Sequence, residues 1–267
     1  MTQVALTIAG SDSSGGAGIQ ADLKTFAFHC VHGASALTCV TAQNTVGVTQ
    51  VSAMDVSMVE AQISAVANDF KVDAVKTGML LNCEIIEAVA QQINHWGLNN
   101  NLVVDPVMVS RAGVQLINDD AIALLKKLLI PQATIVTPNL YEAQILSGLE
   151  ITTLEQLKQA AISIHERLGA KVVLAKGGGF LDRGKGTDVW YDGSQLKILF
   201  EESVTTQNTH GTGCTLSAAI CAGLASNLEL WSSVAAAKKY VTSALKHSLN
   251  IGAGSGPVGH FFPLIKL

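Results

Sequence analysis

The sequence has few charged residues and no concentration of positive charge. Asp, Glu, Lys and Arg together make up 14% of its 267 residues, and the formal net charge is −4. Without a cluster of Lys and Arg, the chain lacks the electrostatic footprint of proteins that bind nucleic acid or anionic membranes. We therefore expect neither nucleic acid nor membrane as a partner, and any bound phosphate must be met by local positive charge.

Cysteine is also scarce, and its arrangement excludes two common roles. The five cysteines are odd in number and contain no C-x-x-C pair, so they indicate neither a disulfide framework nor a zinc site. The chain begins Met-Thr-Gln without a basic segment, and none of its apolar runs approaches the length of a membrane span. These features predict an unprocessed cytoplasmic protein.

Apolar residues and glycine are abundant, at 48% of the chain and 24 residues respectively, which suits a large buried sheet covered by helices. Short, β-branched apolar runs predict strands at residues 4–8, 36–40, 74–76, 102–105, 135–137 and 172–176. Segments of helical periodicity separate these runs, so we expect a parallel sheet with right-handed crossovers. The predicted fold class is α/β, a three-layer sandwich whose mostly parallel central sheet is flanked by helices.

The helical segments account for most of the remaining chain. They are residues 19–28, 56–69, 83–96, 120–129, 140–147, 154–168, 212–226 and 230–249. After Lys176 the pattern changes, and the turn Asp192-Gly193-Ser194 predicts an antiparallel hairpin of residues 188–191 and 196–200 at one sheet edge. No Pro/Ser-rich or charged linker interrupts the chain, so we expect residues 1–267 to form a single domain.

The most informative segment is Thr209-His210-Gly211-Thr212-Gly213-Cys214, where two glycines open a predicted helix. The first N–H groups of a helix lack intrahelical partners, and the helix dipole adds positive charge there, so such a turn binds anions. The same dipole would give Cys214 thiolate character, which makes it a candidate base, nucleophile or polar contact. A glycine-broken turn with a small buried cysteine is the alternative.

Two glycine-rich segments approach known nucleotide-binding motifs without matching them. Residues 16–21 fit the dinucleotide fingerprint G-x-G-x-x-A, but residues 36–42 lack the acidic residue that would hold the ribose. Residues 179–186 have P-loop spacing, but a glycine stands where magnesium needs a hydroxyl, and a hairpin follows instead of a helix. We therefore expect the second segment to be a mobile surface loop.

Polar residues follow several of the predicted strands, and ligands of open α/β sheets bind beyond the carboxyl ends of the strands. They include Gln43, Asp105, Asn139, Glu142 and Lys176. Each has a structural alternative, since Asn139 could be a helix N-cap and Gln43 could satisfy a loop backbone. Together they supply amide contacts, two carboxylates for magnesium and a lysine for phosphate at one sheet edge.

The complete set of motifs resembles the ribokinase-like superfamily, and within it the hydroxymethylpyrimidine/phosphomethylpyrimidine kinases of thiamine biosynthesis. The matching segments are residues 9–25, 42–45, 76–80, 105–108, 137–142, 176–178 and 209–217, in order through the chain. The resemblance implies transfer of phosphate from ATP to 4-amino-5-hydroxymethyl-2-methylpyrimidine and then to its monophosphate. It also implies ATP and Mg²⁺ as cofactors, small-molecule substrates, and a homodimer.

The resemblance assigns roles residue by residue. The implied pyrimidine contacts are Gln43, Asp22, Ala17, Gly10, Met79 and Val107. The implied ATP contacts are Lys176, Thr209, His210 and Asn139, and the implied magnesium ligands are Asp105 and Glu142. Cys214 stands where related sugar kinases place an aspartate base, and Gly211 and Gly213 complete the catalytic turn. Gly179 departs from the pattern, because a histidine is common at this place in the family.

Three other functions are compatible with parts of the sequence. A pyridoxine or pyridoxal kinase of the same superfamily is the nearest, because its substrate also bears a hydroxymethyl group; the match at residues 43–45 and Met79 favour the pyrimidine. A non-catalytic pyrimidine-binding protein would not need the set Asp105, Glu142, Lys176 and Cys214. A nicotinamide-dependent dehydrogenase would need the missing ribose acid.

Overall fold

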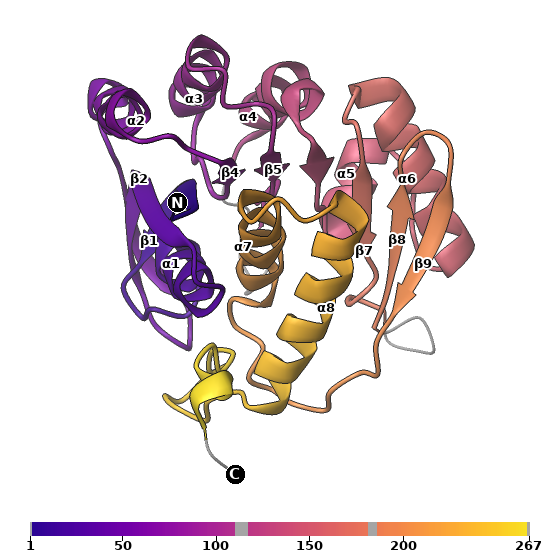
Figure 1. Cartoon of the computed structure of the whole chain (residues 1–267). Coiled ribbons are helices and arrows are strands. Elements are labelled where there is room, and N and C mark those ends of the chain that lie inside the picture. Colours follow the sequence, from indigo (N-terminus) through magenta and orange to yellow (C-terminus); the bar gives the residue numbers. More distant parts are fainter. Residues whose placement is uncertain (1, 110–116, 181–185, 266–267) are drawn as a thin grey trace.

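The computed structural model describes residues 2–109, 117–180 and 186–265, and its strands form one continuous sheet (Figure 1). The strands are β1 (Val4–Asp12), β2 (His32–Gln43), β3 (Val48–Ala53), β4 (Ala74–Thr77), β5 (Leu102–Val104), β6 (Ile135–Val136), β7 (Val173–Lys176), β8 (Thr187–Tyr191) and β9 (Leu196–Phe200). Their order across the sheet is β3-β2-β1-β4-β5-β6-β7-β8-β9. Of the near P-loop at residues 179–186, residues 181–185 lie outside the described residues.

The sheet is parallel in its centre and antiparallel at its edges. Strands β2, β1, β4, β5, β6 and β7 run parallel, whereas β3 pairs antiparallel with β2 at one edge, and at the other edge β8 pairs antiparallel with both β7 and β9. The mostly parallel sheet and the β8–β9 hairpin are as the sequence predicts. Strand β3 was not predicted, because nearly all its residues are exposed and it lacks the apolar run of a buried strand.

Helices cover both faces of the sheet, which gives the three layers seen in Figure 1. One face carries α1 (Gly18–Phe28), α7 (Thr212–Ala225) and α8 (Leu230–Lys246). The other face carries α2 (Val56–Asp69), α3 (Cys83–His95), α4 (Asp119–Leu124), α5 (Leu140–Ser147) and α6 (Leu154–Leu168).

One predicted helix, residues 120–129, is not a continuous α-helix. Helix α4 ends at Leu124 and is followed by a π-helical turn at Leu125–Leu129 and a 3₁₀ turn at Ile130–Gln132. Pro131 lies in the last turn. In a continuous α-helix a proline at this position would lack the N–H for an intrahelical bond, and its ring would collide with the preceding turn. The apolar period alone could not show this change of helix type.

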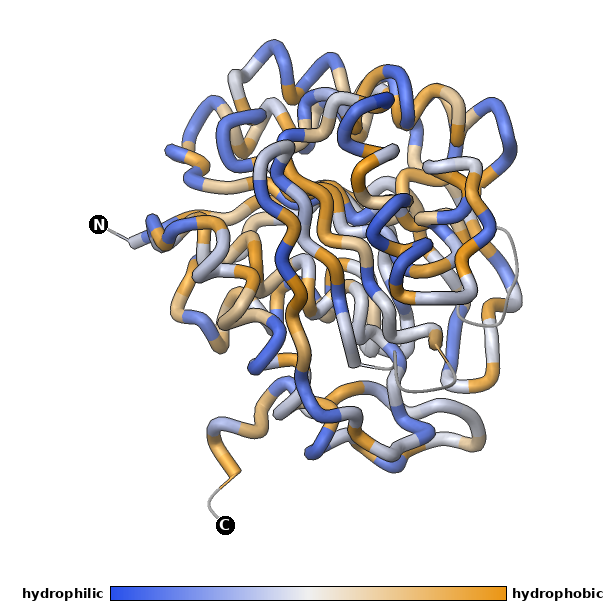
Figure 2. The backbone as a smooth tube through the Cα atoms, turned by 90° about the vertical axis from the view of Figure 1, so that its right-hand side faces the viewer, coloured by the Kyte–Doolittle hydropathy of each residue, from blue (hydrophilic) through white to orange (hydrophobic). Residues whose placement is uncertain are grey.

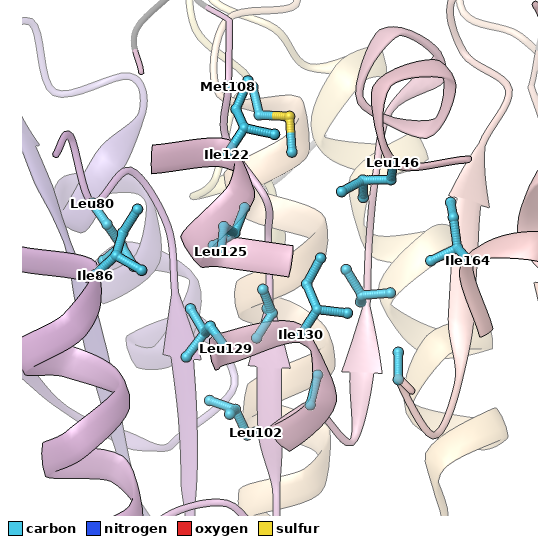
Figure 3. Close-up of a cluster of buried hydrophobic side chains, with 14 of the residues drawn as sticks. Leu80, Ile86, Leu102, Met108, Ile122, Leu125, Leu129, Ile130, Leu146 and Ile164 are labelled. Carbon is cyan, nitrogen blue, oxygen red and sulfur yellow. The ribbon is translucent and has the colours of Figure 1, made fainter. Parts of the chain in front are cut away.

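Two hydrophobic clusters, one on each face of the sheet, hold the layers together. Figure 2 shows hydrophobic stretches along the interior strands and hydrophilic stretches on outer turns. In the larger cluster Leu102, Leu129 and Ile130 are fully buried between the strands and the helical layer (Figure 3). Burial of each such side chain contributes about 1.5–3 kcal/mol. No helix of the described ranges is long and apolar enough to cross a membrane.

The order of the strands determines where a ligand can bind. Strand β1 pairs with β2 on one side and with β4 on the other, so the chain changes its direction of progress across the sheet at β1. In open α/β sheets the crevice at such a switch point, beyond the carboxyl ends of the strands, is the usual ligand site. The segments that leave β1 and β4 here begin at Ser13 and Gly78.

Packing between α7 and α8 leaves no room for a side chain at Gly223. An added Cβ would lie 2.7 Å from Ser233 Oγ and 2.8 Å from Ser233 Cβ. We expect Gly223→Ala to lower the free energy of unfolding by about 1–2 kcal/mol, because overpacking outweighs the gain in helix propensity. Urea unfolding measures the change, and Gly47→Ala is the control, because a Cβ there meets nothing within 4 Å. Equal stability of the two variants would contradict close packing here.

Candidate functional site

An open cleft of about 770 Å³ lies at the carboxyl ends of the central strands. It is lined by every site residue predicted from the sequence except Asp22: Gly10, Ala17, Gln43, Met79, Asp105, Val107, Asn139, Glu142, Lys176, Thr209, His210, Gly211, Gly213 and Cys214. Residues separated by more than 200 positions in the sequence therefore meet at one place. The volume is within the range of small-ligand sites.

The start of α7 faces into this cleft, and two glycines there allow neighbouring groups to approach the helix closely. Gly211 caps the helix with φ 81°, and a Cβ there would collide with the carbonyl of Gly16 in the loop after β1. A Cβ at Gly213 would lie 3.4 Å from Lys176 Nζ, so the lysine stands beside the first turn of the helix. The start of α7 and the charge of Lys176 thus lie side by side, an arrangement that suits an anion.

Lys176, at the end of β7, is paired with Asp105, which follows β5. Lys176 Nζ lies 3.2 Å from Asp105 Oδ1, while Ser217 and Thr137 donate hydrogen bonds to the same carboxylate at 3.0 and 3.3 Å. Burial alone would raise the pKa of Asp105, but Lys176 and Lys76 outweigh it and lower that pKa. Asp105 is therefore an ionised carboxylate inside the cleft.

Glu142 is a second buried carboxylate, and it lies within the electrostatic influence of Lys176. Asn139 is the N-cap of α5: its side chain accepts from Glu142 N–H at 2.9 Å, and Glu142 Oε2 accepts from Asn139 N–H at 2.8 Å. Asn139 is therefore a helix N-cap, which was its structural alternative, and it also lines the cleft. Burial raises the pKa of Glu142 to about 7, against the opposing effect of Lys176.

Asp105 and Glu142 suit a magnesium ion that takes only some of its ligands from the protein. Among the described residues no group of three or more His, Cys, Asp or Glu side chains is placed to hold a metal by itself. Magnesium is commonly bound by one or two carboxylates, with phosphates and water completing its shell. A divalent cation would also favour ionisation of Glu142.

Cys214 lies in the first turn of α7, but it is not a thiolate. Burial raises the pKa of Cys214 to about 11, although the positive charge of Lys76 opposes this and the Gly18 N–H donates a hydrogen bond to the sulfur. The expectation of thiolate character from the helix dipole is therefore wrong, because desolvation of the sulfur outweighs the dipole. Near neutral pH the side chain is a neutral thiol.

Asp22 is fully buried beneath the cleft and does not line it. Lys76 Nζ lies 2.7 Å from each Asp22 carboxylate oxygen, and Thr7 Oγ1 donates to Asp22 Oδ2 at 2.7 Å. Burial alone would lower the pKa of Lys76, but Asp22 outweighs this and keeps the lysine charged. Lys76 does line the cleft, so Asp22 affects the site through this lysine.

The opposite end of the cleft, beyond β1, β2 and β4, has the apolar walls expected for a ring. A Cβ at Gly10 would lie 2.7 Å from Cys39 Sγ and 3.1 Å from Met79 Cε, so the floor of this pocket is closely packed. Thr38 Oγ1 fixes the backbone of Met79 by donating to its carbonyl at 2.6 Å. Gln43 contributes a polar side chain to this wall.

The structure also shows site residues to which the sequence did not assign roles. Asp12 accepts from the N–H groups of Gly16 and Ala17 at 3.0 and 2.8 Å and thereby holds the glycine loop. Asp188 and Lys238 form an ion pair at 2.5 Å beside Lys176. Turn chemistry could have indicated Asp12, whereas no local signal links Asp188 to a lysine in a distant helix.

Asp12 provides a test of this loop through pH. Burial alone would raise the pKa of Asp12, but hydrogen bonds from His210 and Ser14 outweigh it and lower the pKa from 3.8 to about 2. A lowered carboxyl pKa stabilises the fold above pH 4, and this contribution is lost as the pH falls from about 4 to about 2. Discounted for solvent screening, it amounts to about 1–2 kcal/mol.

We therefore expect Asp12→Asn to unfold at lower urea concentration than the wild-type chain at pH 7. The difference should shrink as the pH falls from 4 toward 2, because Asp12 of the wild-type chain becomes protonated first in the unfolded and then in the folded state. Asp69→Asn, an exposed carboxyl at the end of α2, is the control and should change stability little. A deficit for Asp12→Asn that is the same at pH 7 and pH 3 would contradict the ionised state of Asp12.

Comparisons with known proteins agree with this geometry. The family model described as phosphomethylpyrimidine kinase matches residues 12–259. The hydroxymethylpyrimidine/phosphomethylpyrimidine kinase of Synechococcus elongatus is 55% identical over 98% of both chains. A crystal structure of an ADP complex of Bacillus subtilis pyridoxal kinase has 42% identity and a TM-score of 0.90 over 98% of both chains.

A crystal structure of phosphomethylpyrimidine kinase from Clostridium difficile has 40% identity and a TM-score of 0.81, and it covers 91% of this chain and 100% of that one. The resemblance inferred from the sequence motifs is thus confirmed, as is the ribokinase-like fold. The chain belongs to the phosphomethylpyrimidine kinase family, and it is a phosphotransferase of that family.

Proposed function

We propose that this chain transfers phosphate from ATP to 4-amino-5-hydroxymethyl-2-methylpyrimidine and then to its monophosphate. The observation that carries the proposal is the placement of Lys176 Nζ beside Gly213 at the open start of α7, in the same cleft as Gln43 and Met79. One end of the cleft suits an apolar ring with a few polar contacts, and the other suits a chain of phosphates. The names of the relatives support this substrate pair.

The ATP site is proposed at the α7–α8 side of the cleft. Apolar surface for the base is offered by Val204, Val241 and Leu245. Hydrogen-bond donors for the phosphates are offered by Thr209 and Lys176. The Asp188 carboxylate also accepts from the Gly177 N–H at 3.1 Å, which supports the backbone next to Lys176.

Asp105 and Glu142 are the proposed ligands of Mg²⁺. Bound with ATP, the ion would neutralise charge on the phosphates during transfer. The residues themselves are prepared for this role: Lys176 and Ser217 orient the Asp105 carboxylate, and Asn139 orients that of Glu142. Glu142, with its pKa raised to about 7 by burial, would gain most from a nearby cation.

Cys214 is proposed to orient the substrate hydroxyl. A neutral thiol is a poor base at pH 7, but phosphoryl transfer passes through a loose transition state in which positioning and charge stabilisation dominate. Lys76 below the thiol favours any negative charge that develops there. The hydrogen bond from the Gly18 N–H to the sulfur acts in the same direction.

Pyridoxal or pyridoxine is the second candidate substrate. The pyridoxine kinase of Bacillus subtilis is 44% identical over 96% of this chain, and the fold of the pyridoxal kinase is closely similar. Both ring systems carry a hydroxymethyl group that could lie near Cys214. Identity favours the pyrimidine kinases, at 55%.

Further proposals concern the organisation of the protein. We propose that residues 1–267 act as a single kinase domain, supported by the one continuous sheet. A homodimer is supported by edge strand β3, which is exposed and carries Val51 beside the exposed Val46. A cytoplasmic location remains a prediction from the odd number of cysteines.

The substrate assignment is tested by measuring ATP consumption with the pyrimidine, its monophosphate and pyridoxine in parallel. We expect the highest kcat/KM with the pyrimidine compounds and a requirement for Mg²⁺. Gln43→Leu should lower kcat/KM for the pyrimidine by about 5- to 150-fold, because buried polar groups of the ligand lose a partner worth 1–3 kcal/mol. Higher kcat/KM with pyridoxine would make the second candidate the correct one.

The role of Cys214 is tested by truncation. Cys214→Ala should lower kcat about 100-fold, the low end for loss of a positioned proton acceptor, since the thiol is neutral. KM for ATP should remain within about twofold, because the phosphates are proposed to contact the backbone of α7 and Lys176. Cys214→Ser retains a hydrogen-bonding group of similar size and should lose less. Full turnover in Cys214→Ala would reduce the thiol to a packing residue.

A further inference from the structure

The imidazole of His210 lies where three segments distant in sequence meet. Its Nε2 is 2.8 Å from Asp12 Oδ2 and 3.3 Å from Gln43 Nε2. Its backbone N–H donates to Gly256 O at 3.1 Å, and its carbonyl accepts from Val258 N–H at 3.2 Å. Although the resemblance suggested an ATP contact, the ring is directed toward the wall that carries Gln43.

The ring of His210 is held tightly in this orientation. The residue is 8% exposed, and a Cβ on Gly16 would collide with the imidazole. Backbone bonds on both sides fix the main chain from which the ring projects. The position of Nε2 is therefore a fixed feature of the pocket wall.

The Asp12 carboxylate decides which atom carries a proton. Asp12 Oδ2 already accepts from the N–H groups of Gly16 and Ala17, and its pKa is lowered to about 2, so the carboxylate is ionised. An ionised carboxylate can only accept hydrogen bonds. His210 Nε2 must therefore carry a hydrogen and donate it to Asp12, whether the ring is neutral or charged.

Because His210 Nε2 carries this hydrogen, both polar atoms of the Gln43 amide face a group of their own hydrogen-bonding type. Gln43 Nε2 is a donor that faces the Nε2–H donor of His210. Gln43 Oε1 lies 3.2 Å from Thr41 Oγ1, whose single hydrogen has a shorter bond, at 2.9 Å, to Ser11 O. At one end a donor thus faces a donor, and at the other an acceptor faces an acceptor.

A half-turn of the amide about its last torsion resolves both conflicts. Gln43 Oε1 then shares the hydrogen of His210 Nε2 as the second, longer acceptor beside Asp12 Oδ2, in a three-centre bond, and one Gln43 N–H donates to Thr41 Oγ1. The terminal torsion of glutamine is broad, so the turn costs little. The second Gln43 N–H and one lone pair of Oε1 are left for a ligand in the cleft.

We propose that His210 is a positioning residue that sets the Gln43 amide with Oε1 toward the imidazole, and thereby fixes the order of donor and acceptor presented to the substrate ring. The proposal rests on the proposed function, in which Gln43 contacts an aminopyrimidine. Such a ring offers an acceptor nitrogen beside an amino donor, the complement of an amide held in one orientation. Without His210 the amide is free to turn, and half of its orientations oppose the ligand.

The first test measures the protein without any ligand. The ¹⁵N shifts of His210 should show a hydrogen on Nε2 at pH 7. An unprotonated Nε2 at pH 7 would overturn the proposal. This measurement is independent of the substrate, so it stands even if the proposed function fails.

The second test measures binding of the pyrimidine and of ADP, separately, by calorimetry. His210→Leu should weaken the pyrimidine by about tenfold or more and ADP by less than about twofold. His210→Gln keeps an N–H near the position of Nε2 and should restore pyrimidine affinity to within about threefold. His95→Leu, an exposed histidine at the end of α3, is the matched control and should bind as the wild-type chain does.

Each remaining outcome is decisive. Weaker ADP binding with unchanged pyrimidine binding would make His210 a nucleotide contact and overturn the proposal. An equal loss of both affinities would also overturn it, because that pattern indicates general disruption of the fold. If His210→Leu does not fold, His210→Gln and the ¹⁵N shifts decide alone. A wild-type chain that binds ADP but not the pyrimidine would instead refute the proposed function.

Discussion

Compensation of buried charge is the constraint on which the site depends. Asp22 and Lys76 neutralise each other below the cleft, and Asp105 and Lys176 neutralise each other within it. Glu142 is a further buried carboxylate of the cleft, and burial raises its pKa to about 7. A divalent cation beside Glu142 would therefore favour its ionised form.

The fold was predictable where burial makes a strand apolar on both faces. The runs that became β1, β4, β5, β6 and β7 carry this signal, and a parallel sheet follows from their alternation with helices. Strand β3 was not predictable in this way, because it is stabilised by pairing with β2 and not by its own burial. Likewise, the change of helix type before Pro131 depends on local backbone bonding that periodicity does not report.

The position of the site was predictable because parallel strands end at one edge, which brings Gln43, Asp105 and Lys176 together without knowledge of their contacts. The direction in which the side chains point was not predictable from the sequence. Asp22 turns toward Lys76, and the thiol of Cys214 is governed by desolvation more than by its helix. Such outcomes depend on distances between segments far apart in the chain.

The segment at residues 252–258 ties the wall around Gln43 to a distant part of the chain. Ser255 N–H donates to Thr45 O at 2.9 Å, Thr209 N–H donates to Ser255 Oγ, and Gly256 bonds His210. The wall around Gln43 is therefore completed by a segment far along the chain from β1 and β2. Pairing of β1 with β2 alone would leave this wall unfinished, so the pocket depends on tertiary contacts that the sheet does not supply.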